Sequence, residues 1–167
     1  MIKSFKDFIS EAANRSLSRT LHHIHHSEMG TMSASRGDKS AKENKHANKA
    51  LEHDLRSHGH SVVHVKGSYV ENQGKHDERR VKEHSMIVHA RKGAPRGELL
   101  THMKHYGKKY HQDSILHKHA DEHHATIHST RHDSEGEHFS VGKAHVNSPN
   151  PHGETHLKGH RSLTFKE

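Results

Sequence analysis

Histidine is the residue type that offers this sequence the most chemistry, because 26 of its 167 residues are His. An imidazole near neutral pH can bind a metal ion, move a proton or hold an anion. His117 and His119 are the best-placed pair for a metal ion, since alternate residues of a strand share one face about 6.6 Å apart. We take His117 and His119 as candidate ligands. Beyond them we expect no cofactor, only adventitious binding of Zn²⁺ or Ni²⁺ by the histidine clusters.

A second histidine pattern is typical of phosphoesterases with two His-x-Ser/Thr motifs, in which imidazoles transfer protons and hydroxyls bind phosphate. The catalytic candidates under this interpretation are His124, Thr126, His138 and Ser140. The two motifs begin only 14 residues apart, on a predicted hairpin, whereas that enzyme class carries them in separate halves. Matches to so short a pattern also arise by chance in a sequence this rich in histidine.

A small-residue loop followed by an arginine is the best candidate for a ligand site. Ser33, Ser35 and Arg36 offer two hydroxyls and a guanidinium that can grip a phosphate or a carboxylate. Other polar residues predicted to complete this polyanion or ligand site are Glu71, Ser85 and Gln112. Cysteine is absent, which excludes disulfides, thiolate metal sites and cysteine nucleophiles.

The charge of the chain favours negatively charged partners. Lys and Arg number 27 against 20 Asp and Glu, a formal net charge of +7. About a quarter of exposed imidazoles are protonated at pH 7, which adds roughly 6 positive charges. Such a surface attracts polyanions, above all nucleic acid, through counterion release. The alternatives are a positive surface that merely keeps the protein in solution, and one whose binding strengthens as the histidines become protonated.

Hydrophobic spacing predicts an α+β fold with a mostly antiparallel sheet and two packed helices. Ser40 and Glu43 form a capping box that opens a helix over 41–58, and Leu99, Met103 and Tyr106 predict a second helix. A separate amphipathic helix over 4–21 precedes a loop over 27–39. The predicted strands cover 61–71, 85–89, 114–119, 124–130, 138–146 and 162–165.

These elements divide the chain into three parts. Residues 1–26 form an N-terminal helix and histidine-rich segment, 27–146 the α+β domain, and 147–167 a C-terminal segment with a short strand. Apolar residues make up only 28% of the chain. No run approaches the roughly 18 apolar residues of a membrane-spanning helix, so we expect no membrane span.

The N-terminus resembles the capsid-targeting peptides of internal head proteins in T-even-type phages. In that family a protease cleaves after Glu in a Leu/Ile-x-Glu motif, which Ile9-Ser10-Glu11 matches. The resemblance implies cleavage after Glu11, loss of residues 1–11, packaging in the virion head and release into the host cytoplasm. The alternative is an ordinary N-terminal helix that packs on the domain.

A second resemblance covers about half of the chain, from Thr31 to His119. Ser33-Ala34-Ser35-Arg36, Glu43-Asn44 and Tyr110-His111-Gln112-Asp113-Ser114 are similar in order and spacing to a family of small uncharacterised phage and bacterial proteins. That family implies kinship but no assigned activity.

The sequence therefore predicts a phage accessory protein that binds nucleic acid or a host protein through a basic surface, and that is not an enzyme. The alternative is a nucleotide phosphoesterase or metal-assisted hydrolase that uses its histidines. The sequence predicts no oligomeric state.

Overall fold

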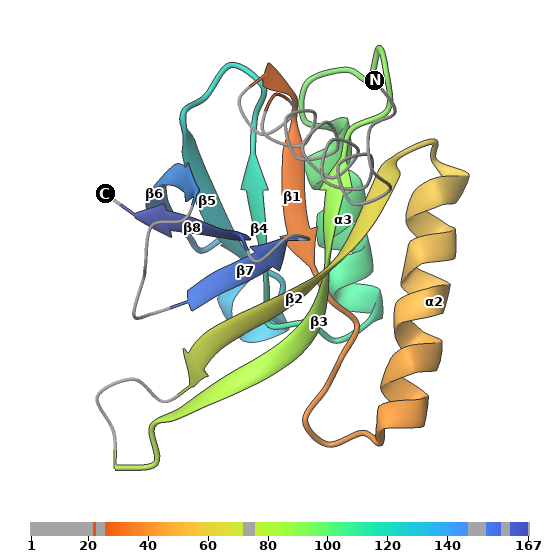
Figure 1. Cartoon of the computed structure of the whole chain (residues 1–167). Helices are drawn as coiled ribbons and strands as arrows, with labels where there is room; N and C mark the ends of the chain where they lie inside the picture. The colour runs from red at the N-terminus through yellow and green to blue at the C-terminus, as the bar shows by residue number, and fades with distance from the viewer. Residues whose placement is uncertain (1–21, 23–25, 72–75, 147–152, 158–160, 167) are drawn as a thin grey trace, which may run out of the picture.

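The computed structural model describes residues 22, 26–71, 76–146, 153–157 and 161–166, and within them eight strands close into one antiparallel barrel (Figure 1). The elements, in chain order, are β1 (Met29–Met32), α2 (Ala41–Ser57), β2 (Ser61–Glu71), β3 (Arg79–His89), α3 (Glu98–Lys109), β4 (Ser114–Lys118), β5 (His124–Ser129), the 3-10 turn η1 (His132–Ser134), β6 (His138–Val146), β7 (Gly153–Leu157) and β8 (Arg161–Lys166).

The barrel corrects the expected α+β fold. Around the barrel the strands follow the order β1-β3-β2-β7-β8-β6-β5-β4, and β1 closes the ring by pairing with both β3 and β4. The prediction was wrong because β1 lies in a segment expected to be a loop, and β7 in one for which no strand was predicted. Each of these two strands bridges two others, so their absence from the prediction left an open sheet with two edges.

Four apolar residues from four strands form a cluster inside the barrel. Met29, Val65, Ile87 and Leu163 are at most 6% exposed and form one cluster. They come from β1, β2, β3 and β8, and each belongs to the set of alternating positions that points inward. This small interior is consistent with the low apolar content of the chain.

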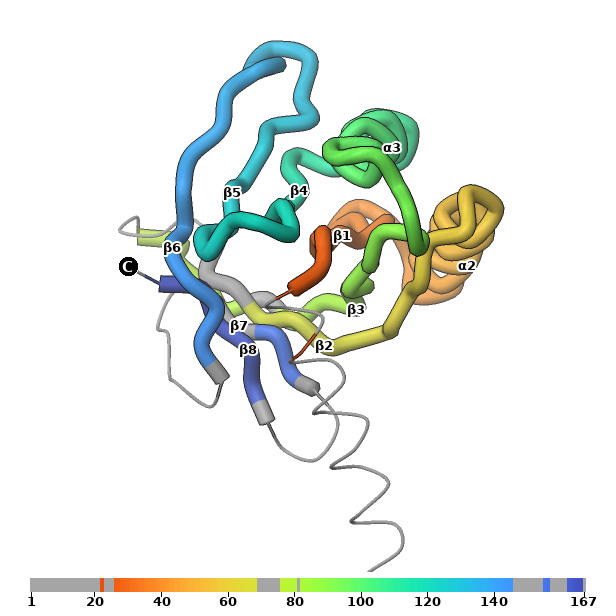
Figure 2. The backbone as a smooth tube through the Cα atoms, turned by 90° about the horizontal axis from the view of Figure 1, so that it is seen from above, coloured from red at the N-terminus to blue at the C-terminus, as the bar shows by residue number. Residues whose placement is uncertain are grey.

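The two helices pack against the outside of the barrel on the same side (Figure 2). The predicted capping box is confirmed: the Ser40 hydroxyl accepts the Glu43 N–H at 3.2 Å, and the Glu43 carboxylate accepts the Ser40 N–H at 2.8 Å. Leu51 and Leu55 of α2 are fully buried in the outer core between helices and strands.

Helix α3 lies so close to β1 that one strand position admits only glycine. A β-carbon at Gly30 would lie 2.4 Å from the Met103 sulfur and 2.6 Å from the Leu116 carbonyl oxygen. The backbone oxygen cannot move aside as a flexible side chain can. Gly30 therefore sets the distance between α3 and the barrel.

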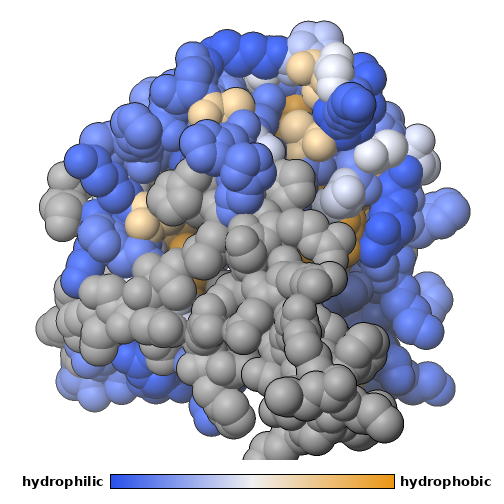
Figure 3. All heavy atoms as spheres, turned by 45° about the horizontal axis from the view of Figure 1, so that its top comes forward, coloured by the Kyte–Doolittle hydropathy of each residue, from blue (hydrophilic) through white to orange (hydrophobic). Residues whose placement is uncertain are grey.

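The other predicted elements can be compared with the structure one by one. The second helix and the strands over 61–71, 114–119, 124–130 and 138–146 are confirmed to within a residue or two. β3 begins at Arg79, earlier than predicted, and with β2 forms a long hairpin. The predicted helix over 4–21 lies outside the described residues. Figure 3 shows a face on which hydrophilic residues predominate and apolar residues appear in small patches.

Candidate functional site

The loop from Ser33 to Arg36, called here the Ser33–Arg36 loop, joins β1 to α2 and is shaped by two asparagines of that helix. Asn48 Oδ1 accepts the Ala34 N–H and Asn44 Oδ1 accepts the Arg36 N–H, both at 2.9 Å. Asn44 Nδ2 also donates to the Arg36 carbonyl at 2.9 Å. Residues four apart share one face of a helix, so α2 presents both amides to the loop. This role was not predicted from the sequence, although the spacing of the two asparagines is visible there.

The beginning of the loop is tied to β3. Ser33 is 4% exposed; its hydroxyl donates to the His84 carbonyl at 2.7 Å and accepts the Ser35 N–H at 3.0 Å. Ser85, the next residue of β3, is half-buried, and its hydroxyl oxygen lies 3.2 Å from where a β-carbon on Gly67 would stand. Ser33 therefore anchors the loop, while Ser85 lies against the neighbouring strand β2.

The end of the loop is tied to the segment between α3 and β4. Gln112 Nε2 donates to the Ser35 carbonyl at 3.1 Å, and Arg36 Nη1 donates to the His111 carbonyl at 2.9 Å. Arg36 Nε also donates to Asp38 at 2.8 Å. The guanidinium is thus held by two contacts, and a guanidinium has five N–H donors in all.

Arg36 and Gln112 line a cleft with a volume of about 680 Å³, called here the Arg36 cleft. This volume lies within the roughly 300–1,000 Å³ of sites for small molecules and cofactors. The remaining lining residues are Lys108, His111, Asp113, Thr130, Arg131, His132, Asp133 and Glu135.

The Arg36 cleft carries charges of both signs. Arg131 pairs with Asp133 at 2.6 Å and Lys108 pairs with Glu135. The hydrogen bond from Arg131 lowers the pKa of Asp133, and that from Lys108 lowers the pKa of Glu135. Both carboxylates are therefore ionised at neutral pH, beside two cations, which suits a ligand that itself carries both signs.

The predicted ligand residues divide into two groups. Ser33, Ser35, Arg36 and Gln112 are brought together around the loop. Glu71 is the last residue of β2, opposite Arg79, whereas Ser85 pairs with Val65, six residues earlier in β2. Glu71 thus lies roughly 20 Å along the hairpin from Ser85, and its side chain lies outside the described part of the structure.

The two His-x-Ser/Thr motifs lie on the paired strands β5 and β6, but their histidines do not lie close together. Thr126 pairs with Ser140, but His138 pairs with His128 and His124 pairs with Lys143. The backbones at His124 and His138 are therefore separated by about four strand positions, roughly 13 Å. This spacing does not place both imidazoles on one phosphate.

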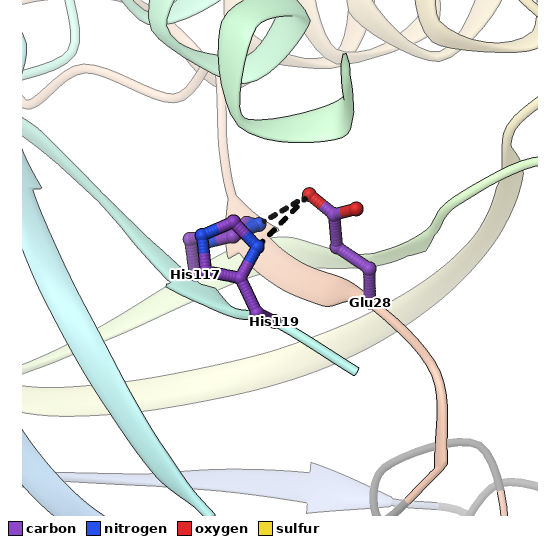
Figure 4. Close-up of side chains that lie close together, drawn as sticks. All are labelled: Glu28, His117 and His119. Carbon is purple, nitrogen blue, oxygen red and sulfur yellow. Dashed lines mark hydrogen bonds and ion pairs between the residues drawn. The ribbon is translucent and has the colours of Figure 1, made fainter. Parts of the chain in front are cut away.

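The candidate metal ligands His117 and His119 do lie together, with a third residue that the sequence did not indicate (Figure 4). Glu28, the residue before β1, accepts a hydrogen bond from His117 Nε2 at 2.8 Å. Glu28 is 7% and His117 2% exposed. Burial lowers the pKa of His117 even though Glu28 acts in the opposite direction, so the imidazole is held in its neutral form, the form that binds metals.

A second histidine cluster joins the start of β2 to α3. The His60 Nδ1 accepts the Arg91 N–H at 3.1 Å, so His60 Nε2 carries the proton and donates to His102 Nδ1 at 2.8 Å. Glu98, which lies nearby, is held by both Nε and Nη2 of Arg91. The ligand atoms of this cluster are already used in hydrogen bonds, so a metal ion would have to displace them.

Two further sequence predictions concern the N-terminal cleavage position and membrane-spanning segments. The predicted cleavage position Glu11 lies outside the described residues. In the described segments, the helices are too short or too polar to cross a bilayer.

Comparison with known protein families gives a match over most of the chain. A family model described as the S-adenosylmethionine lyase family matches residues 30–161, about four fifths of the chain. A search of curated proteins gave no match.

This match corrects the predicted function. The expectation of a phage accessory protein that binds through a basic surface was wrong, because the matched family is one of enzymes named for a lyase reaction. The enzymatic alternative was closer, although it named a hydrolase. The resemblance from Thr31 to His119 falls within the matched residues, whereas the resemblance to internal head proteins is not supported.

Proposed function

The chain belongs to the S-adenosylmethionine lyase family, and we propose on this basis that it cleaves a carbon–sulfur bond of S-adenosylmethionine. The extent of the match carries the proposal. Residues 30–161 run from β1 to the first residue of β8, so nearly the whole barrel, both described helices and the Ser33–Arg36 loop lie inside it.

The sulfonium group of S-adenosylmethionine makes a C–S bond easy to break. Its sulfonium sulfur becomes a neutral thioether when it takes the electron pair of a breaking C–S bond. We propose cleavage on the methionyl side, because the carboxylate there can reach the γ-carbon by closing a five-membered ring. The γ-carbon then gains either a bond to a carboxylate oxygen, which closes a lactone, or a double bond after loss of a β-proton to a base. Both routes release methylthioadenosine and consume no water.

Arg36 supports the proposal as the residue that binds the substrate carboxylate. Its guanidinium lines the Arg36 cleft and is held in place by the His111 carbonyl and Asp38. An arginine binds a carboxylate through two parallel N–H···O bonds. An arginine so held loses little conformational freedom on binding and fixes the direction of the methionyl chain.

The acidic residues of the cleft support binding of the cationic groups. The substrate carries a sulfonium and an ammonium, so it has a net charge of about +1 at neutral pH, against +7 for the chain. Long-range attraction therefore does not bring it to the protein. Asp113, Asp133 and Glu135 line the same cleft and supply local negative charge.

The first experiment is incubation of the full chain with S-adenosylmethionine, followed by chromatography and mass spectrometry of the products. Heat-denatured protein corrects for spontaneous breakdown of the substrate. We expect methylthioadenosine to accumulate with one four-carbon amino acid product per turnover. Formation no faster than with denatured protein would overturn the proposed activity.

The second experiment tests the site. We expect Arg36→Ala to lower kcat/KM by about 10- to 100-fold, the effect of losing a hydrogen bond to a charged group. Arg96→Ala is the matched control, because Arg96 is an exposed arginine that pairs with Asp121 and Glu122 outside the cleft. Equal activity of the two variants would show that the substrate does not bind in the Arg36 cleft, but it would not contradict the proposed activity.

A further inference from the structure

Three metal-ligating side chains converge beside the start of α3, at a place that the proposed function does not use. They are Glu28, His117 and His119, and all three point toward one another (Figure 4). We propose that these three residues bind one zinc ion. The proposal stands independently of the lyase activity, because none of the three lines the Arg36 cleft.

The distances suit a zinc ion with little rearrangement. His117 Nε2 lies 2.8 Å and His119 Nδ1 3.7 Å from the same oxygen, Glu28 Oε1, and the three ligand atoms lie within 4.8 Å of one another. Ligand atoms about 2.0–2.2 Å from a tetrahedral zinc ion stand roughly 3.3–3.5 Å apart. Shifts of about 1 Å in side-chain positions therefore complete the site.

Strand pairing explains why the three residues meet. β1 pairs with β4 so that Met29 stands opposite Lys118, which places Glu28, one residue earlier, opposite His119. His117 and His119 are two residues apart and share one face of the sheet. The ligands therefore come from two hydrogen-bonded strand ends and not from independent loops.

His119 gives a second, separate indication of a missing ligand. Its Nδ1 is buried and, within the described residues, has no hydrogen-bond partner. A buried polar atom without a partner costs about 1–3 kcal/mol. This atom lies 3.7 Å from Glu28 Oε1. A metal ion bound between the two atoms would give Nδ1 the partner that it lacks.

Neighbouring groups hold the ligands in orientation, as the outer partners of metal sites do. The Gly97 N–H donates to Glu28 Oε2 at 3.3 Å, which leaves Oε1 directed at the histidines. Lys118 Nζ donates to the His119 carbonyl at 2.7 Å and to the Glu122 carbonyl at 2.9 Å. Lys118 alternates with His117 and His119 along the chain, so its ammonium does not occupy the ligand face.

The donor set favours zinc over calcium and magnesium. Two imidazoles and one carboxylate suit zinc, whereas Ca²⁺ and Mg²⁺ prefer oxygen ligands only. His119 is 18% exposed, against 2% for His117, so the site lies nearest to solvent at His119. A water molecule that enters there would supply the fourth ligand.

The test is a competition titration of the full chain with Zn²⁺ against a chromophoric chelator strong enough to hide the weak sites that 26 histidines provide. Wild type is expected to compete for one equivalent. His119→Ala should weaken this binding by about 100-fold or more, because loss of an outer partner alone weakens a site by about 10- to 100-fold. His123→Ala, an exposed histidine four residues further on, should bind like wild type.

A second readout reports the geometry and excludes a folding defect. Co²⁺ in the wild-type site should show the strong visible absorption of a tetrahedral ion, and His119→Ala should not. Metal-free His119→Ala should unfold at a urea concentration no lower than that of metal-free wild type, because the variant removes a buried atom without a partner. If it unfolds earlier, Glu28→Gln takes its place as the ligand variant. Absence of a competing equivalent in wild type, or its retention in both ligand variants, would overturn the proposal.

Discussion

At the scale of single residues, several polar side chains of this protein hold backbone segments in place through hydrogen bonds. Asn44 and Asn48 bind the Ser33–Arg36 loop from one side, and Gln112 binds it from the other. Arg36 is itself held by two partners before any substrate arrives. A loop fixed in this way loses little conformational entropy when a ligand binds, so the site is preorganised.

The pair of His60 and His102 leads to a prediction about pH. Burial lowers the pKa of both, with His102 acting further on His60 and the stacked His58 acting further on His102. Below the unfolded value of about 6.5, the unfolded chain takes up protons that the folded chain does not. The free energy of unfolding should therefore fall as the pH drops below 6.5, by about 1.4 kcal/mol for each unit by which a folded pKa is lowered.

The measurement compares urea unfolding of wild type and His60→Asn at about pH 7.5 and pH 5.5. Asparagine keeps an acceptor near the Arg91 N–H but does not titrate, so the variant should lose less stability between the two pH values. The comparison is needed because the pKa values of His117 and His128 are also lowered, so these histidines contribute to the total pH dependence. An equal loss in both proteins would show that the pair does not contribute.

Residue types and order predicted part of the site and could not predict the rest. Ser33, Ser35 and Arg36 lie within four consecutive residues, so any fold keeps them together, and Gln112 was included through the pattern around it. Glu28 was not predicted because it becomes a neighbour of His119 only through the pairing of β1 with β4. Spacing along the chain carries no information on Glu28, which lies 89 residues before its hydrogen-bond partner His117.

At the scale of elements, the contact between α3 and β1 gives a prediction about stability. Gly30→Ala would place a β-carbon against the Met103 side chain and the Leu116 carbonyl. We expect a loss of about 1–3 kcal/mol in the free energy of unfolding, the usual cost of overpacking. Gly37→Ala is the control, because nothing lies within 4 Å of its added carbon. Urea unfolding should show the control within about 0.5 kcal/mol of wild type, and a similar value for Gly30→Ala would contradict the close packing.

Elements with strong local signals were predictable, and those made by pairing were not. α2 has a capping box and leucines every fourth residue, so its limits follow from local chemistry alone. β1 has four residues, Met-Gly-Thr-Met, and β7 is the largely polar Gly-Glu-Thr-His-Leu. Neither has the alternation that marks a strand, and both become strands because the barrel offers each two partners.

At the scale of the whole molecule, net charge was a poor guide to function. A formal charge of +7 favours polyanions in general, but the substrate proposed from the family is a cation. In the Arg36 cleft the three carboxylates are matched by Arg36, Lys108 and Arg131, so the cleft lacks the positive excess of the whole chain. Its local charges matter more to a bound ligand than distant lysines and arginines do, because electrostatic energy falls with distance and is screened by salt. The barrel supplies the rigid frame that keeps this local arrangement distinct from the average charge.

The central claim is that the chain breaks a carbon–sulfur bond of S-adenosylmethionine without water. Turnover in water labelled with heavy oxygen, followed by mass spectrometry of the four-carbon product, tests it most directly. We predict methylthioadenosine together with a product that carries no label on its γ-carbon. Label on that carbon would show hydrolysis instead, and an unchanged substrate would contradict the assignment altogether.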